Sequence, residues 1–441
     1  MKKTYFILTI VSLFLSCFAV SAKTYFIAVN GSDTNQGTKE APFATIMQAQ
    51  KVVEAGDTVY IRGGKYLITD IQLSRRQRLN KVINFLYKSG ESGKLINYWA
   101  FPGERPVFDF SQIKPENSRV MAFNVTGSWI HLKGFEVTGV QVTMLGHTQS
   151  ECFHNEGSNN IYENLSMHDG QAIGFYLTDG SDNLILNCDA YRNWDYTSEG
   201  GRGGNTDGFG CHGKPGSVNN VFRGCRAWFN SDDGYDCIRA AETVTFENCW
   251  AMYNGYNADF KNLGDGNGFK AGGWGLKLDE RVPDSIQGHI IRFCVAVGNK
   301  ANGFYSNHHP VGSYWLNNTA YRNSVNFNML NRNAEFTEDL PGFGHTLINN
   351  LSFEPRNYDI SQINYDKCTL QNNSFQLKLK LYANDFISLD EKLLVLPRNA
   401  DGSLPNIDFM KSSKSSQVID KGIDAGFPFK GKAPDLGAFE R

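Results

Sequence analysis

The sequence predicts an all-β fold, a single-domain parallel β-helix, because two short signatures recur along most of the chain. The first signature is a glycine followed by an aromatic residue, and it begins at Gly174, Gly208, Gly234, Gly268 and Gly303. The second signature falls between these pairs, and its centres are Cys188, Cys225, Cys249, Cys294 and Asn318. A fixed motif order with variable spacing is typical of a solenoid whose coils carry insertions on one side.

Both signatures describe a short strand followed by a turn. Apolar and polar residues alternate over a few positions and then break at Asn or Gly, and this pattern is too short for a helix. A coil of about 22–30 residues built from such strands cannot bury its inner face alone, so successive coils must stack. Neighbouring strands then lie about 4.8 Å apart in parallel sheets, and equivalent side chains form ladders along the axis.

Residues 1–22 have the features of a secretory signal peptide. Two lysines precede an apolar run that reaches Val20, and small residues lead to Lys23, so we expect cleavage after Ala22. The run is shorter than the roughly 20 residues that a membrane-spanning helix needs. The predicted location is therefore secreted or periplasmic, without a membrane span. A lipoprotein anchor at Cys17 is the alternative, but Phe14 fits poorly three positions before it.

Residues 23–441 are expected to form one domain, because no Pro/Ser-rich linker or low-complexity tract divides them. A solenoid grows lengthwise, so this length needs no second core. Residues 44–56 have helix-like apolar spacing and a terminal glycine, which predicts a helix that caps the open end of the solenoid. From about residue 372 to residue 441 the repeat is lost, and we expect an irregular C-terminal cover. The chain is expected to be a monomer.

The charge balance narrows the possible partners. The chain has 43 Lys+Arg and 45 Asp+Glu, a net charge of −2, so a strongly basic surface for nucleic acid is excluded. Any contacts that bind an acidic polymer must therefore come from a local group of residues.

Of nine cysteines, all but Cys17 follow the signal peptide. Secretion permits disulfides, and Cys225–Cys249 or Cys211–Cys237 could lie within reach one coil apart. We favour free, buried thiols, since Cys also packs as a small apolar residue.

Superposing the glycine–aromatic pairs brings acidic residues of two coils together. Asp207 aligns with Asp233, Asp232 lies beside it, and Asp236 lies level with Lys270 one coil further on. Two carboxylates about 4 Å apart repel by roughly 4 kcal/mol at an effective dielectric of 20, so the group must share protons or bind a cation. Acidic oxygen ligands on flexible turns favour Ca²⁺ over Mg²⁺, and zinc lacks suitably spaced His or Cys. The alternative is that each Asp only closes a turn.

Lys270 occupies one of these aligned positions within a glycine-rich turn. A nearby cation lowers the pKa of a lysine, whereas nearby carboxylates raise it. If the cation has the larger effect, a neutral amine becomes available as a base. The alternative is an ordinary, solvated surface ion pair.

This pattern resembles the family 9 polysaccharide lyases, right-handed parallel β-helix enzymes that cleave pectic galacturonans. The positions that carry the resemblance are Asp207, Asp232, Asp233, Asp236 and Lys270. Residues 25–66 and 423–440 are also similar to the terminal segments of secreted bacterial β-helix lyases. The resemblance implies that the four aspartates bind a catalytic Ca²⁺ and that Lys270 is the Brønsted base.

The implied reaction is β-elimination on pectin, the acidic polysaccharide of plant cell walls. Removal of the C5 proton of a galacturonate and cleavage of the C4–O4 bond would leave a 4,5-unsaturated product. We expect an alkaline optimum, since a lysine base must be neutral and its ordinary pKa is about 10.4. Arg239, close after the acidic turn, is expected to pair with a substrate carboxylate. The backbone could be polygalacturonate or rhamnogalacturonan I.

Two other functions fit a β-helix with clustered aspartates. A β-helix glycoside hydrolase would use one carboxyl group as acid and another as base, and it would release saturated sugars without Ca²⁺. A non-catalytic glycan-binding or adhesin β-helix would use calcium structurally. Ultraviolet absorbance of pectic digests, with and without a chelator, separates these three functions.

Overall fold

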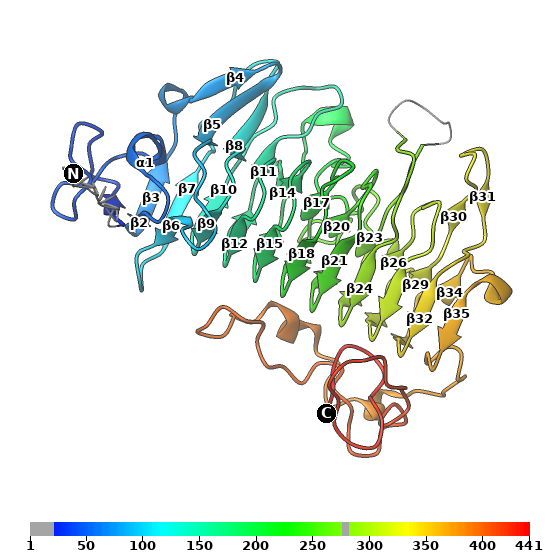
Figure 1. The fold of residues 1–441 in the computed structure, drawn as a ribbon. Helices are drawn as coiled ribbons and strands as arrows, with labels where there is room; N and C mark the ends of the chain where they lie inside the picture. The colour runs from blue at the N-terminus through cyan, green and yellow to red at the C-terminus, as the bar shows by residue number, and fades with distance from the viewer. Residues whose placement is uncertain (1–21, 276–281) are drawn as a thin grey trace, which may run out of the picture.

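Three parallel sheets wind along one axis, and each complete coil gives one strand to each sheet (Figure 1). The computed structural model describes residues 22–275 and 282–441. The predicted signal peptide before Ala22, and Cys17 within it, therefore lie outside the described residues. The paired strands are parallel in all three sheets, except for one hairpin at the edge of the third, so the prediction of a parallel β-helix is confirmed.

The strands of the three sheets follow one another in turn along the chain. Within the described residues, the first sheet contains β1 (Thr24–Ile27), β2 (Thr58–Ile61), β6 (Ile96–Ala100), β9 (Ile130–Lys133), β12 (Ile161–Glu163), β15 (Leu184–Leu186), β18 (Asn220–Arg223), β21 (Val244–Glu247), β24 (Ile290–Arg292), β27 (Tyr314–Leu316), β32 (Thr346–Ile348) and β35 (Thr369–Gln371). The second sheet contains β3 (Gly64–Leu67), β7 (Pro106–Asp109), β10 (Glu136–Thr138), β13 (Ser166–His168), β16 (Asp189–Tyr191), β19 (Arg226–Trp228), β22 (Trp250–Met252), β25 (Val295–Val297), β28 (Thr319–Tyr321) and β33 (Leu351–Phe353). The third sheet contains β4 (Arg75–Gln77), β5 (Asn80–Leu86), β8 (Arg119–Val125), β11 (Glu151–Asn155), β14 (Ile173–Leu177), β17 (Phe209–Cys211), β20 (Tyr235–Asp236), β23 (Phe269–Lys270), β26 (Asn302–Tyr305), β29 (Val325–Asn328) and β34 (Tyr358–Ser361).

The glycine–aromatic pairs form a ladder on the inner side of the third sheet. The rings of Tyr235 and Phe269 stack with centroids 4.6 Å apart and an interplanar angle of 1°. A Cβ atom added to Gly234 would lie 2.7 Å from the carbonyl oxygen of Gly268 and 2.8 Å from Nδ2 of Asn254. The pair recurs because the aromatic ring fills the core, while the position before it leaves no room for a side chain.

Asparagine and cysteine form further buried ladders. The amide of Asn230 donates to Oδ1 of Asn254 (3.1 Å), and the amide of Asn254 donates to Oδ1 of Asn299 (3.0 Å). Each amide thus satisfies a buried neighbour one coil away. The eight cysteines of the described residues are all free, and all but Cys368 are buried, so the preference for free thiols is confirmed.

A short helix and a long irregular segment cover the solenoid. Helix α1 (Ile46–Val52) begins at Thr45, whose side chain accepts a hydrogen bond from Gln48 N, and it buries Ile46 and Ala49, so the predicted cap is present. The other helical turns are of the 3-10 type: η1 (Asp70–Gln72), η2 (Ser198–Gly200), η3 (Tyr365–Lys367), η4 (Ala383–Asp385) and η5 (Glu391–Val395). No helix among the described residues is long and apolar enough to cross a membrane.

The C-terminal segment runs back along the coils, as the orange and red chain in Figure 1 shows. Its side chains pack on the outer face of the second sheet, where Phe386, Leu394 and Phe409 join the same apolar cluster as Trp250. A buried ion pair network fastens it further along. Asp189 accepts from Arg226 of β19 (2.8 Å) and from Arg398 of the cover (2.6 Å). The irregular cover expected beyond residue 372 is therefore observed.

Candidate active site

One outward-facing row of the third sheet carries the candidate catalytic residues. Strand pairing places Tyr176, Gly210, Asp236, Lys270 and Tyr305 at equivalent positions of five successive coils. Asp236 and Lys270 are direct neighbours across β20 and β23, so the alignment expected from the glycine–aromatic pairs is confirmed.

Long connections hold the acidic residues at the edge of this row. Residues 192–208 and 253–268 enter the third sheet at β17 and β23, whereas the intervening connection before β20 is short. The backbone N–H of Asp265, within the second long connection, donates to Oδ1 of Asp232 (2.7 Å). The insertions predicted from the uneven motif spacing therefore build the surroundings of the site.

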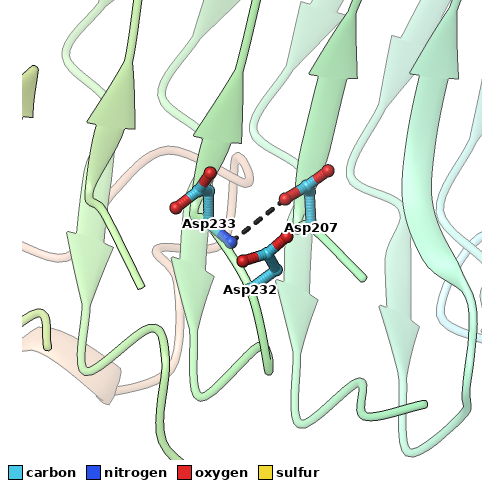
Figure 2. A group of neighbouring side chains, drawn as sticks. All are labelled: Asp207, Asp232 and Asp233. Carbon is cyan, nitrogen blue, oxygen red and sulfur yellow. Dashed lines mark hydrogen bonds between the residues drawn. The ribbon is translucent and has the colours of Figure 1, made fainter. Parts of the chain in front are cut away.

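The four aspartates are buried and lie on two adjacent coils, as Figure 2 shows for three of them. Asp207 Oδ1 accepts the backbone N–H of Asp233 (3.0 Å), and Asp233 Oδ1 accepts the backbone N–H of Asn267 (2.6 Å). These bonds fix the carboxylates in register with the strands. One oxygen each of Asp207, Asp232 and Asp233 lies within 4.8 Å of the others.

Asp236 is oriented differently from the other three aspartates. Its Oδ1 accepts the backbone N–H of Ile238 (2.6 Å), and its Oδ2 lies 3.2 Å from Nζ of Lys270. Asp236 therefore joins the cluster through Lys270, whereas Asp207, Asp232 and Asp233 converge directly on one another.

Lys270 lies between two carboxylates, with a side chain that is only 11% exposed. Its Nζ is 3.0 Å from Oδ2 of Asp233 and 3.2 Å from Oδ2 of Asp236. The contact with Asp233 has the distance of an ion pair but not the geometry of a hydrogen bond, so this buried oxygen has no hydrogen-bond donor.

The electrostatics of the cluster are unfavourable without an additional cation. Burial and the neighbouring carboxylates raise the pKa of Asp207 and Asp232 well above the ordinary value, and burial also raises the pKa of Asp233. Burial alone would lower the pKa of Lys270, but Asp233 and the other aspartates outweigh it and raise that pKa well above its usual range. One ammonium group cannot neutralise four carboxylates. An excess of buried negative charge and an oxygen without a donor both fit a hard divalent cation.

Arg239 and His212 lie close to this row. Arg239 is exposed, has a left-handed backbone (φ 61°), and has no carboxylate within ion-pair distance in the described part of the chain. His212 packs against Tyr176 with ring centroids 4.7 Å apart, and its buried Nε2 has no hydrogen-bond partner among the described residues. Burial lowers the pKa of His212, which keeps the imidazole neutral.

Tyr305, like Tyr176 earlier in the row, is a residue that the sequence patterns did not single out. It follows the glycine–phenylalanine pair of its coil just as Lys270 follows the pair before it, and the two are direct neighbours across β23 and β26. The signal was present in the alignment of the repeats, but a tyrosine on a strand carries no acidic or basic pattern that would single it out.

Comparison with known proteins identifies the fold and the enzyme class. The family model described as the Pel9A-like, right handed beta helix region matches residues 25–350. Pectate lyase L of Dickeya dadantii is 34% identical over 95% of this chain and 91% of its own length. A solved structure of a rhamnogalacturonan lyase is 45% identical and superposes with a TM-score of 0.86 over 89% of this chain and 97% of that one. The structure of pectate lyase Pel9A is 32% identical, with a TM-score of 0.76 over 96% and 98% of the two chains. The chain therefore belongs to polysaccharide lyase family 9, and it is a polysaccharide lyase with the right-handed β-helix of that family.

Proposed function

We propose that this enzyme cleaves a galacturonate-containing pectin backbone by calcium-assisted β-elimination, with Lys270 as the base. The observation that carries the proposal is the position of Lys270 Nζ, 3.0 Å from Asp233 and 3.2 Å from Asp236, beside a group of converging carboxylates. A glycoside hydrolase would need a carboxyl group free to protonate the glycosidic oxygen. Here the converging carboxylates accept backbone N–H groups and face one another.

Asp207, Asp232, Asp233 and Asp236 would hold the Ca²⁺. They offer only oxygen atoms, and Ca²⁺ accepts six to eight oxygen ligands in loose geometry, so the remaining places would fall to water and substrate. When bound, the cation would neutralise the uronate carboxylate and so make the neighbouring C5 proton more acidic. Asp233 Oδ2, which accepts no hydrogen bond among the described residues and lies 3.0 Å from Lys270 Nζ, supports this assignment.

Lys270 would remove the C5 proton through Nζ. The side chain is nearly buried and held from two sides, so little conformational freedom is lost when it meets the substrate. The carboxylates that raise its pKa favour the charged form, and the reaction therefore needs both a bound cation and an alkaline solution. Once the C5 proton is removed, the C4–O4 bond breaks and the 4,5-unsaturated uronide is released.

Substrate contacts and location complete the proposal. Arg239 would pair with a galacturonate carboxylate, since the residue is exposed and has no ion pair within the described residues.

Between the two pectic backbones, the 45% identity to a rhamnogalacturonan lyase, against 32% to pectate lyase Pel9A, favours rhamnogalacturonan I. The predicted signal peptide would deliver the enzyme, as a monomer, to the periplasm or the exterior.

The decisive experiment compares the parental enzyme with the Lys270→Ala variant. Both are incubated with rhamnogalacturonan I backbone and with polygalacturonate, with calcium or with a chelator, and unsaturated product is followed by ultraviolet absorbance. We expect the parent to need calcium, and the variant to lose about 10³-fold in kcat, because a positioned base contributes 10²–10⁴-fold.

Circular dichroism and calorimetric calcium titration serve as controls for the variant. A correctly folded, calcium-binding Lys270→Ala protein that cleaves at the parental rate would refute the role of Lys270. Release of saturated sugars by the parental enzyme would instead support a hydrolase.

A further inference from the structure

A chain of hydrogen-bonded side chains begins one coil beyond Lys270. Tyr305 Oη lies 3.0 Å from Nε2 of His308, and Nδ1 of His308 lies 2.8 Å from Oδ1 of Asp339. Arg332 donates to the same oxygen of Asp339 from Nε (2.8 Å) and lies 2.7 Å away through Nη2. These four side chains are separate from the aspartate cluster.

The residues of this hydrogen-bonded series that lie farthest from Lys270, Asp339 and Arg332, are held by a hairpin. Arg332 and Asp339 face each other across the antiparallel hairpin of β30 (Asn331–Arg332) and β31 (Asp339–Leu340). Arg332 is 5% exposed and also donates to the backbone carbonyl of Trp274, which lies in the connection that follows Lys270. The hairpin thus ties His308 to the same connection that leaves the catalytic strand.

The backbone is bent to bring His308 back to Tyr305. Asn307 and His308 both have left-handed conformations, with φ values of 52° and 58°. Such conformations are costly for residues other than glycine and persist where the surroundings hold them. The turn places the imidazole within hydrogen-bond distance of a hydroxyl only three residues earlier.

The two side chains of the row diverge from each other. Lys270 contacts Asp233 and Asp236 on the preceding coil, whereas Tyr305 is hydrogen-bonded to His308 of its own coil. No hydrogen bond joins these two side chains, so each can act on a different atom of a substrate bound over the row.

Elimination requires a second proton transfer, because the departing O4 must become a hydroxyl group. Given the proposed function of Lys270, we infer that Tyr305 is the catalytic acid that protonates O4 of the leaving sugar. Lys270 Nζ takes the C5 proton, the C5 electron pair forms the C4=C5 double bond, and the C4–O4 bond breaks as O4 takes the proton of Tyr305 Oη. Solvent then returns a proton to the phenolate, while His308 holds Tyr305 Oη in position.

The surroundings of Tyr305 suit this role. Burial raises the pKa of Tyr305 to about 12, although the charge of Lys270 lowers it. The phenol therefore keeps its proton in the alkaline range in which a lysine base is active. Asp339 fixes the orientation of the His308 imidazole, and Arg332 in turn holds Asp339.

The test compares Tyr305→Phe with the parental enzyme in calcium-containing D₂O. We expect kcat to fall about 100-fold or more with KM within about threefold, since loss of a general acid costs 10²–10⁴-fold. When O4 departs slowly, the C5 carbanion takes a deuteron back from Lys270. Uncleaved substrate recovered from Tyr305→Phe should then carry deuterium at C5, whereas substrate recovered from the parent or from Lys270→Ala should not.

Tyr314→Phe is the matched control, because Tyr314 is half-exposed on the first sheet, away from this row. It should retain the parental rate. His308→Gln should lower kcat about tenfold, and its recovered substrate should carry less deuterium at C5 than that from Tyr305→Phe. This variant tests the same hydrogen-bonded series if Tyr305→Phe does not fold.

Three outcomes would overturn the role of Tyr305. One is a Tyr305→Phe variant with kcat within twofold of the parent. Another is a folded, calcium-binding variant that has lost both cleavage and exchange. If the parent itself releases no unsaturated product, the proposed function fails together with this inference, whereas the first two outcomes leave the proposed function intact.

Discussion

The same position of the β-helix holds aspartate in two coils and asparagine in the next two. Asp233 Oδ1 accepts the backbone N–H (2.6 Å) and the amide (2.8 Å) of Asn267, and Asn267 Oδ1 accepts the backbone N–H (3.2 Å) and the amide (2.7 Å) of Asn302. The hydrogen bonds that connect the coils are therefore available to either residue type. What the aspartate adds is a second, charged oxygen, which at Asp233 has no hydrogen-bond donor. The contrast separates the structural role of the position from its role in the site.

The Asp233→Asn substitution tests this contrast most directly, because it gives this coil the residue that the next coil has at the equivalent position, Asn267. We expect calcium affinity to fall by about 100-fold or more, and activity to fall with it, because a direct ligand should cost at least as much as its supporting residues. The free energy of unfolding without calcium should not decrease, since the hydrogen bonds remain and one of the repelling charges is removed. Calorimetric titration and denaturant unfolding check the two parts. Equal calcium binding by variant and parent would contradict the assignment.

Without calcium, the free energy of unfolding should depend on pH, because the aspartates of the two acidic coils then repel one another. The pKa values of Asp207, Asp232 and Asp233 are raised in the folded protein, so above their ordinary value of 3.8 the unfolded chain releases protons more readily. Without calcium, the free energy of unfolding should therefore fall as the pH rises through the acidic range toward neutrality.

Calcium at about 100 times its dissociation constant should add roughly 2.7 kcal/mol at neutral pH, because it binds only the folded state. Thermal unfolding in chelator and in calcium, across this pH range, measures both effects. Asp233→Asn is the control, since it should show little difference between the two conditions. A parental protein whose stability in chelator is independent of pH would contradict the expected repulsion.

The reverse substitution, Asn267→Asp, sharpens the comparison with a smaller effect. It extends the acidic ladder by one coil and replaces the amide that donates to Asp233 Oδ1 with a carboxylate. We expect the free energy of unfolding without calcium to fall by about 1–4 kcal/mol, the scale of one close charge pair. Asn302→Asp, one coil further from Asp233, should cost less in the same denaturant titration. Equal losses for the two variants would mean that the effect is not electrostatic.

The arrangement of the coils could be predicted from the sequence because its physical constraint is local. Gly234 has no room for a side chain, and the ring of Tyr235 must stack on Phe269, so the repeat fixes the register. That register correctly placed Asp236 beside Lys270.

The contacts made by insertions could not be predicted in the same way. His308 and Asp339 are 31 residues apart and meet because a hairpin folds over the coil, and no repeat encodes its docking. Asp189 and Arg398 are 209 residues apart and meet through the irregular cover. Repeats fix neighbours within the ladder, whereas these partners depend on the path of a loop through space.

The ion pairs of Asp189 with Arg226 and Arg398 affect how the molecule unfolds. In a solenoid whose repeats touch only their neighbours, coils can fray from an open end one after another. Here the C-terminal cover is attached to coils near the middle of the chain, since Arg398 binds Asp189 while Arg226 donates to the carbonyl of Leu396. The terminal coils cannot unfold without breaking these contacts. The C-terminal half should therefore unfold as one cooperative unit rather than coil by coil.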